Sequence, residues 1–80
     1  MAGPTREWQI RATGILRAEI ARRGVSQRDL IERLAGMGLK ESESGLSNKL
    51  ARGSFSAAYM LAILTAIGCK TVRVDQEDDE

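Results

Sequence analysis

Residues 42–53, SESGLSNKLARG, combine two leucines with side chains that hydrogen bond or carry positive charge. Leu46 and Leu50 are four residues apart, so on a helix they share one face and can be buried together. The remaining positions hold small polar and basic side chains: Ser44, Ser47, Asn48, Lys49 and Arg52. The spacing predicts a short helix with one anchored face, whose other face suits a groove lined with hydrogen-bonding edges and negative charge.

In such a groove, three of these side chains are candidates for reading DNA bases: Ser44, Ser47 and Asn48. Asn48 is the strongest of them, because an amide can make two hydrogen bonds to adenine. The candidates for binding phosphate surround this helix or begin the preceding one: Gln27, Arg28, Lys40, Lys49, Arg52 and Ser54. Two alternatives stay open: that Asn48 braces a nearby loop, and that Lys49 and Arg52 are ordinary solvated residues.

Catalytic chemistry finds no support in the residue types. The chain has no histidine and one cysteine, Cys69, so it lacks a histidine base and the ligands of a thiolate zinc site. It has no phosphate-binding glycine motif, and Glu41 and Glu43 are expected to be surface charge. We therefore expect no enzyme activity, no catalytic residue, no metal, no cofactor and no small-molecule substrate.

The charge of the chain is unevenly distributed. The formal net charge is +1, but residues 75–80, DQEDDE, hold five of the eleven acids. Residues 1–74 therefore carry twelve Lys and Arg against six Asp and Glu, a balance of about +6. A basic body favours a polyanionic partner, whereas the acidic tail is expected to be disordered or to fold back on the basic helix.

Eighty residues predict one small domain with a marginal core, for which dimerisation is a common remedy. We expect a leader over residues 1–5, a domain over residues 6–74 and the acidic tail over residues 75–80. No signal peptide is visible, and the longest nearly apolar run, residues 57–68, is too short to span a bilayer. These features predict a cytoplasmic protein without a membrane partner.

Local signals divide the domain into helices. Thr5 can cap a helix that reaches Arg23 and ends at Gly24, although Gly14 in its interior indicates either a later start or a close crossing by another element. Serines are expected to cap the three following helices: Ser26, Ser42 and Ser56. Gly53 is expected to end the helix that Ser42 begins.

The last part of the chain is strongly apolar. Residues 56–68 predict a fourth helix that is apolar almost all round, to be buried by its own domain or by a second copy. Residues 70–74 alternate as a short strand would, and that strand would pair with another protomer. We expect Trp8 and Tyr59 to be core or dimer contacts and Cys69 to be buried. The apolar residues 37 and 39, in the turn after the second helix, are expected to tuck beneath the domain.

The stretches VSQRDLIERL and NKLARG, followed by the apolar fourth helix, resemble the lambda-repressor-like, Cro/C1-type helix-turn-helix family over residues 16–68. The longer pattern from WQIRATGILRAEI to SAAYMLAIL is similar to a group of short bacterial proteins of unknown function with that fold. The resemblance implies an all-α domain of four to five helices, usually dimeric, with phosphate binding at Gln27 and base reading within residues 42–49. The stretch from residue 34 to residue 53 is about six residues longer than the usual spacing in that family, so the turn between the second and third helices is enlarged.

The sequence thus predicts a sequence-specific double-stranded DNA-binding protein. We expect a homodimeric transcriptional regulator whose recognition helix spans residues 42–52. The alternative is a protein-interaction module, adaptor or antitoxin-like, that uses the apolar helix at residues 56–68.

Overall fold

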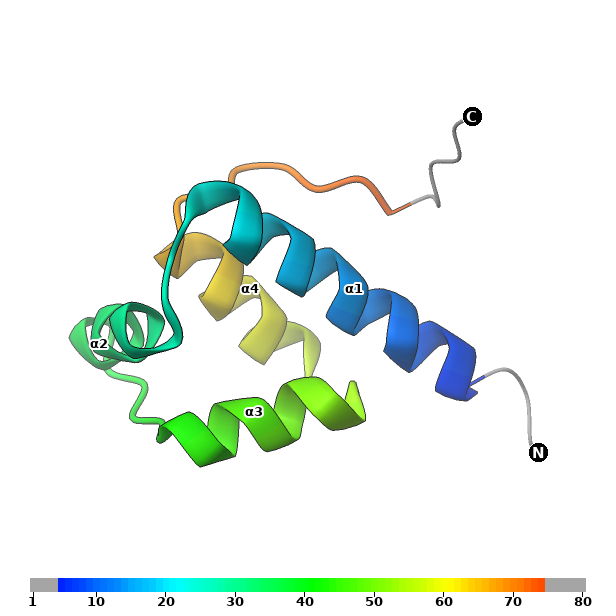
Figure 1. The fold of residues 1–80 in the computed structure, drawn as a ribbon, viewed down its shortest axis with the longest axis horizontal. Helices are drawn as coiled ribbons and strands as arrows, with labels where there is room; N and C mark the ends of the chain where they lie inside the picture. Colours follow the sequence, from blue (N-terminus) through cyan, green and yellow to red (C-terminus); the bar gives the residue numbers. More distant parts are fainter. Residues whose placement is uncertain (1–4, 75–80) are drawn as a thin grey trace.

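The computed structural model describes residues 5–74, and within them it contains four helices and no strand. The helices are α1 (Thr5–Arg23), α2 (Gln27–Gly36), α3 (Glu43–Arg52) and α4 (Ala57–Ala66) (Figure 1). The all-α prediction is confirmed. The predictions for the acidic tail and for most of the leader lie outside the described residues.

The three predicted serine caps are confirmed. Each serine hydroxyl accepts a hydrogen bond from the backbone N–H three residues later, at 2.9–3.0 Å: Ser26 from Asp29, Ser42 from Gly45 and Ser56 from Tyr59. Such a bond satisfies one of the N–H groups that a helix leaves without an internal partner. The residue at which each of these helices begins is therefore set by a local side-chain hydrogen bond.

Helix α1 runs through Gly14 without interruption. The helix begins at Thr5, so the alternative of a later start is wrong. A Cβ atom at Gly14 would meet nothing within 4 Å, so the alternative of a close crossing is wrong as well. The cost of a glycine inside a helix, about 1 kcal/mol, is offset by the packing of the rest of α1.

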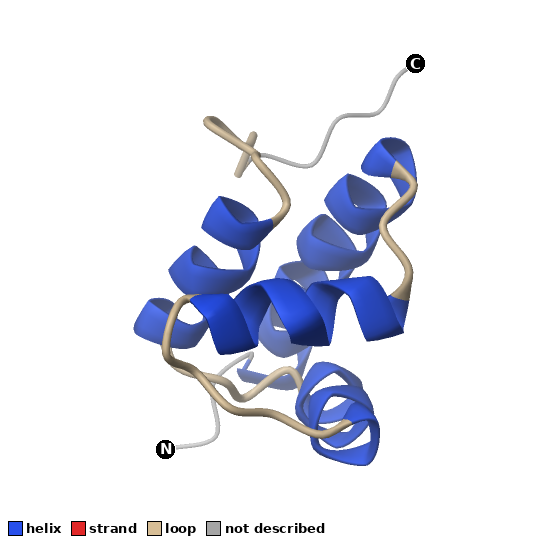
Figure 2. Ribbon diagram, turned by 90° about the vertical axis from the view of Figure 1, so that its left-hand side faces the viewer, coloured by secondary structure: helices blue, strands red, loops and turns tan. Residues whose placement is uncertain are grey.

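The four helices enclose one core. Helices α1 and α2 each contact both α3 and α4, so the core is closed by a ring of contacts (Figures 1 and 2). Every helix contributes at least one side chain that is almost completely buried: Leu16, Leu30, Leu34, Leu46 and Ile63. Because all four helices share these contacts, the core holds each helix in a fixed rotation about its own axis.

Helix α4 is buried on one side only. Tyr59, Ile63 and Leu64 belong to the core, as predicted for Tyr59, but Leu61 is 63% exposed. Its own domain therefore does not bury this helix on most sides, and burial by a second copy stays a prediction. No helix within residues 5–74 is long and apolar enough to cross a lipid bilayer.

Expectations about three apolar residues are wrong in whole or in part. Trp8 is 53% exposed, so it is not a core contact, whereas the expected dimer contact stays a prediction. The Arg11 guanidinium lies over the Trp8 ring at 4.8 Å. Met37 is also exposed, whereas Leu39 packs against the core from the 37–42 linker between α2 and α3. Cys69 is partly buried and packs against the core, so its expected burial is confirmed only in part.

The strand predicted at residues 70–74 is absent. This segment runs along α1 on the side of the molecule opposite α3 (Figures 1 and 2). It is held there by a hydrogen bond of 2.9 Å from Arg11 Nη2 to the Val74 carbonyl and by packing of Val72 against the core. A strand needs a second strand beside it, and residues 5–74 contain none.

Gly53 ends α3 in the left-handed conformation, with φ of 69°, and lies directly against α1. A Cβ atom there would collide with the backbone of Gln9, 2.8 Å from its carbonyl carbon. Gly24 has nearly the same φ, 66°, but a Cβ atom would meet nothing within 4 Å. Position 53 therefore requires glycine for two reasons, its left-handed backbone and the close approach of α1, whereas position 24 requires it for the backbone alone.

Replacing these glycines separates the two reasons. Gly24→Ala should lower the free energy of unfolding by about 1–2 kcal/mol, the cost of the left-handed conformation. Gly53→Ala should cost about 1–3 kcal/mol more, because the backbone of Gln9 must move. Chemical denaturation of both variants measures the difference, and equal losses would show that α1 does not pack tightly on Gly53.

Candidate nucleic-acid interface

The anchored and exposed faces of α3 are arranged as the sequence predicts. Leu46 is 1% exposed and Leu50 is 6% exposed, so both belong to the core. The polar and basic side chains of the helix are exposed: Ser44, Ser47, Asn48, Lys49 and Arg52. Helix α3 therefore presents a polar surface opposite its buried face.

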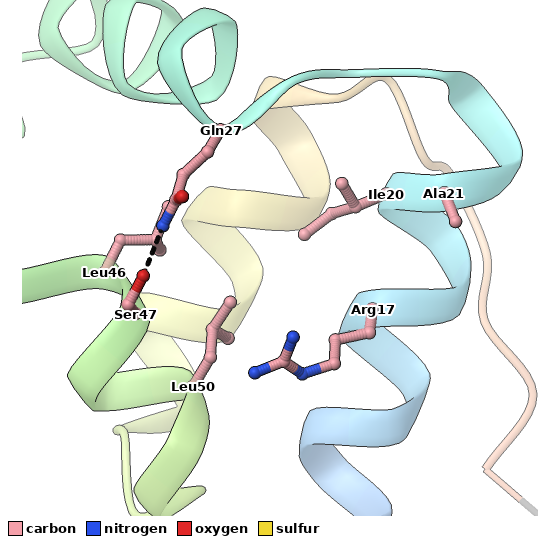
Figure 3. A pocket seen from close by; sticks show the side chains of 7 residues that line it. All are labelled: Arg17, Ile20, Ala21, Gln27, Leu46, Ser47 and Leu50. Carbon is pink, nitrogen blue, oxygen red and sulfur yellow. Dashed lines mark hydrogen bonds between the residues drawn. The ribbon is translucent and has the colours of Figure 1, made fainter. Parts of the chain in front are cut away.

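The start of α3 is tied to the start of α2 by Gln27. Its side-chain Nε2 donates to the Ser47 hydroxyl at 2.7 Å (Figure 3). The same Nε2 donates to the Glu43 carbonyl at 3.1 Å. Ser47 accepts one hydrogen and keeps its own hydroxyl hydrogen for a further acceptor. The sequence predicts both Gln27 and Ser47 as site residues but gives no signal that they are bonded to each other.

The end of α3 is tied to α1. Thr13 Oγ1 donates to the Leu50 carbonyl at 2.6 Å, and Arg6 Nη1 donates to the Arg52 carbonyl at 2.7 Å. The last carbonyls of a helix have no partner within the helix, so these side chains satisfy groups that would otherwise need water. Sequence reasoning missed both contacts, because the partners are far apart in the chain.

Glu41 holds the flank of α3 that faces α4. Its carboxylate, with the side chain only 8% exposed, accepts hydrogen bonds from Tyr59 Oη at 2.6 Å and Lys49 Nζ at 2.9 Å. The prediction that Glu41 is surface charge is wrong, since Tyr59, eighteen residues further along, comes from α4 to cover it. Gly45 leaves room for this carboxylate, because a Cβ atom there would lie 2.5 Å from Glu41 Oε1.

These contacts change the protonation of both partners. The hydrogen bonds from Tyr59 and Lys49 lower the pKa of the Glu41 carboxyl, against a smaller opposing effect of burial. Burial, and then the bond to Glu41, raise the pKa of the Tyr59 hydroxyl. At neutral pH, therefore, a carboxylate and a neutral phenol connect the linker before α3 to α4.

Lys49 is half exposed and already engaged. Its ammonium group pairs with Glu41 and lies 4.8 Å from the centre of the Tyr59 ring. It therefore lies on the α4 flank of α3, whereas Ser47 lies on the flank beside α2. Among the predicted phosphate-binding residues, Lys49 is the one that forms an ion pair within residues 5–74.

The side chain of Asn48 is exposed and makes no hydrogen bond to another residue within the described range 5–74. The alternative that its amide braces a nearby loop is therefore wrong there. Ser44 is exposed as well, with its hydroxyl 3.4 Å from that of Ser42. Both side chains remain available to an external partner.

The other predicted phosphate-binding residues are all exposed. Arg28 lies in the first turn of α2, Lys40 in the linker, Arg52 in the last turn of α3 and Ser54 after it. The cations of this set make no ion pair with any residue in the described part of the chain: Arg28, Lys40 and Arg52. Cations without an ion pair among residues 5–74 thus lie near both ends of α3.

The buried Glu41 carboxylate predicts a pH-dependent contribution to stability. Because its pKa is lower in the folded chain than its ordinary value of 4.5, the stabilisation is complete above pH 4.5 and is lost as the pH falls through the folded-state pKa. Glu41→Gln should therefore be less stable than the wild type at pH 7, and this difference should narrow below pH 4.5.

Thermal denaturation over a pH series measures this difference. Glu32→Gln provides the control, because Glu32 is exposed on α2. A difference between Glu41→Gln and the wild type that stays constant with pH would show that the charge of Glu41 does not stabilise the fold.

Comparison with curated proteins and with solved structures gives no significant match. One family model, described as Domain of unknown function (DUF6471), matches residues 8–72. The match spans all of α2, α3 and α4 and most of α1. It covers far more than half of the chain, and the protein therefore belongs to this family.

Proposed function

We propose that the protein is a sequence-specific double-stranded DNA-binding protein of the helix-turn-helix type, with α3 as its recognition helix. The observation that carries this proposal is the division of α3 into a buried leucine face and an exposed face with Ser44, Ser47 and Asn48. A helix of this shape fits the major groove, where base edges present donors and acceptors.

The chemistry of the exposed face supports base reading. The free amide of Asn48 can donate and accept at once, as the edge of adenine requires. The hydroxyls of Ser44 and Ser47 can serve either role, which suits contacts whose direction depends on the base. Around them, Arg28, Lys40 and Arg52 supply positive charge for backbone phosphates.

The enlarged linker between α2 and α3 does not weaken the proposal. Gln27 fixes the start of α3 to α2, and Glu41 fixes the end of the linker to α4. Recognition requires that the helix be held rigidly relative to the rest of the protein, and these bonds supply that rigidity. Although the linker is longer than in the family that the sequence resembles, these bonds fix its end and the start of α3.

We further propose that the protein acts as a homodimeric transcriptional regulator in the cytoplasm. A single short recognition helix reads few base pairs, and two copies reading a two-fold site give the specificity that regulation requires. The exposed apolar side chains of Trp8, Leu61 and Val74 are available for such an association.

The competing function, a protein-interaction module that uses α4, has less support. The larger apolar residues of this helix that would attract a partner are already used in the core: Tyr59, Ile63 and Leu64. Leu61 is the exception on its exposed side. A stable complex with another protein, together with indifference to DNA, would favour this alternative.

Two exposed residues of α3 should affect DNA binding in different ways. Arg52→Ala should weaken binding to all duplexes alike, because a phosphate contact carries no sequence information. Asn48→Ala should cost about 1–3 kcal/mol at one base pair and relax the preference there. Both side chains are exposed, so neither change should alter the fold.

Selection of binding sites from random duplex pools, followed by affinity titration, measures both effects. A two-fold motif in the selected sites would support the homodimer. The proposal fails if the purified wild type binds no duplex even at low salt, where phosphate contacts are strongest.

A further inference from the structure

An open pocket of about 390 Å³ lies between α1 and α3, beside the exposed face of the recognition helix. Its walls are mainly apolar, and its polar side chains come from three helices (Figure 3). The residues that matter here are Ile20, Leu46 and Leu50 on the apolar side, and Arg17, Gln27 and Ser47 on the polar side. No lining residue is acidic.

Gln27 is not free to donate to an anion in this pocket. Its Nε2 carries two hydrogens, and both are used, by Glu43 and Ser47. The orientation of the amide is fixed because the Glu43 carbonyl can only accept. The remaining side-chain oxygen is an acceptor, which repels a phosphate. Gln27 therefore positions α3, and the phosphate role expected for its side chain must fall to another group.

Arg17 is the cation that the pocket supplies. Its side chain extends from α1 toward α3, with the guanidinium on the side of Leu50 (Figure 3). It makes no hydrogen bond or ion pair with another residue in the described range 5–74. By contrast, Arg22 and Arg23 on the same helix are both paired with Glu19.

We propose that Arg17 binds a phosphate of the DNA backbone at the mouth of this pocket, an inference that rests on the proposed function. The planar guanidinium can donate two parallel hydrogen bonds to one phosphate. Arg17 is exposed, so a phosphate on the surface of a duplex can reach its guanidinium. With no carboxylate lining the pocket, nothing there competes with the phosphate.

The contact gives α1 a direct part in recognition. Arg17 lies across the pocket from Ser47, so a phosphate held there lies beside the face of α3 that reads bases. A phosphate contact carries no sequence information, but it fixes the register of the recognition helix along the duplex. Arg17 and Arg52 would then hold the backbone from different helices.

Arg17→Ala tests the proposal, with Arg22→Ala as the matched control on the same helix. Arg17→Ala should lower affinity roughly tenfold for every duplex and reduce the slope of log affinity against log salt by about one. Arg17→Lys should retain part of the affinity, since it keeps the charge without the fork. Arg22→Ala should leave the slope unchanged.

Duplexes with a single neutral methylphosphonate identify the phosphate itself. The wild type should lose affinity when the contacted phosphate is neutralised, and Arg17→Ala should be insensitive at that position only. An unchanged salt slope and an unchanged methylphosphonate pattern in Arg17→Ala would overturn the role of Arg17 and leave DNA binding intact. Failure of the wild type to bind any duplex would instead overturn the proposed function.

Discussion

The burial of Leu46 and Leu50 is the constraint on which the arrangement of α3 depends. Burying a leucine fully contributes about 1.5–3 kcal/mol, more than an exposed polar contact. Two leucines one turn apart therefore fix the rotation of the helix, and with it the direction of every other side chain. The hydrogen bonds at its two ends fix where the helix lies: Gln27 of α2 holds its start, and Thr13 of α1 holds its end.

The hydrogen bonds to Glu41 fix the end of the long linker between α2 and α3. A carboxylate that is nearly inaccessible to water is costly unless its oxygens are satisfied. Here Tyr59, Lys49 and the Ser42 N–H donate to it, so the group that leads into α3 is tied to α4. Among the hydrogen bonds that hold α3 in place, those to Glu41 connect the helix to α4.

Some arginines of the described residues form ion pairs within their own helix, and others have no ion-pair partner. Arg22 and Arg23 share the Glu19 carboxylate and Arg33 pairs with Asp29, so part of their charge is compensated on their own helices. Arg17 and Arg52 have no such partner within residues 5–74 and lie close to α3. These two arginines without an ion pair thus lie on or beside the helix with the free polar face, which is where a polyanion would be bound.

The sequence by itself determined the features that local chemistry sets: the four helices, their serine caps, the glycine that ends α3 and the buried leucine face of that helix. These signals act over a few residues, and periodicity reports them directly. The tertiary structure alone decided the exposure of Trp8, the burial of Glu41 and the absence of a strand near the C-terminus. Each of these depends on which distant segment lies opposite, and spacing along the chain carries no record of that neighbour.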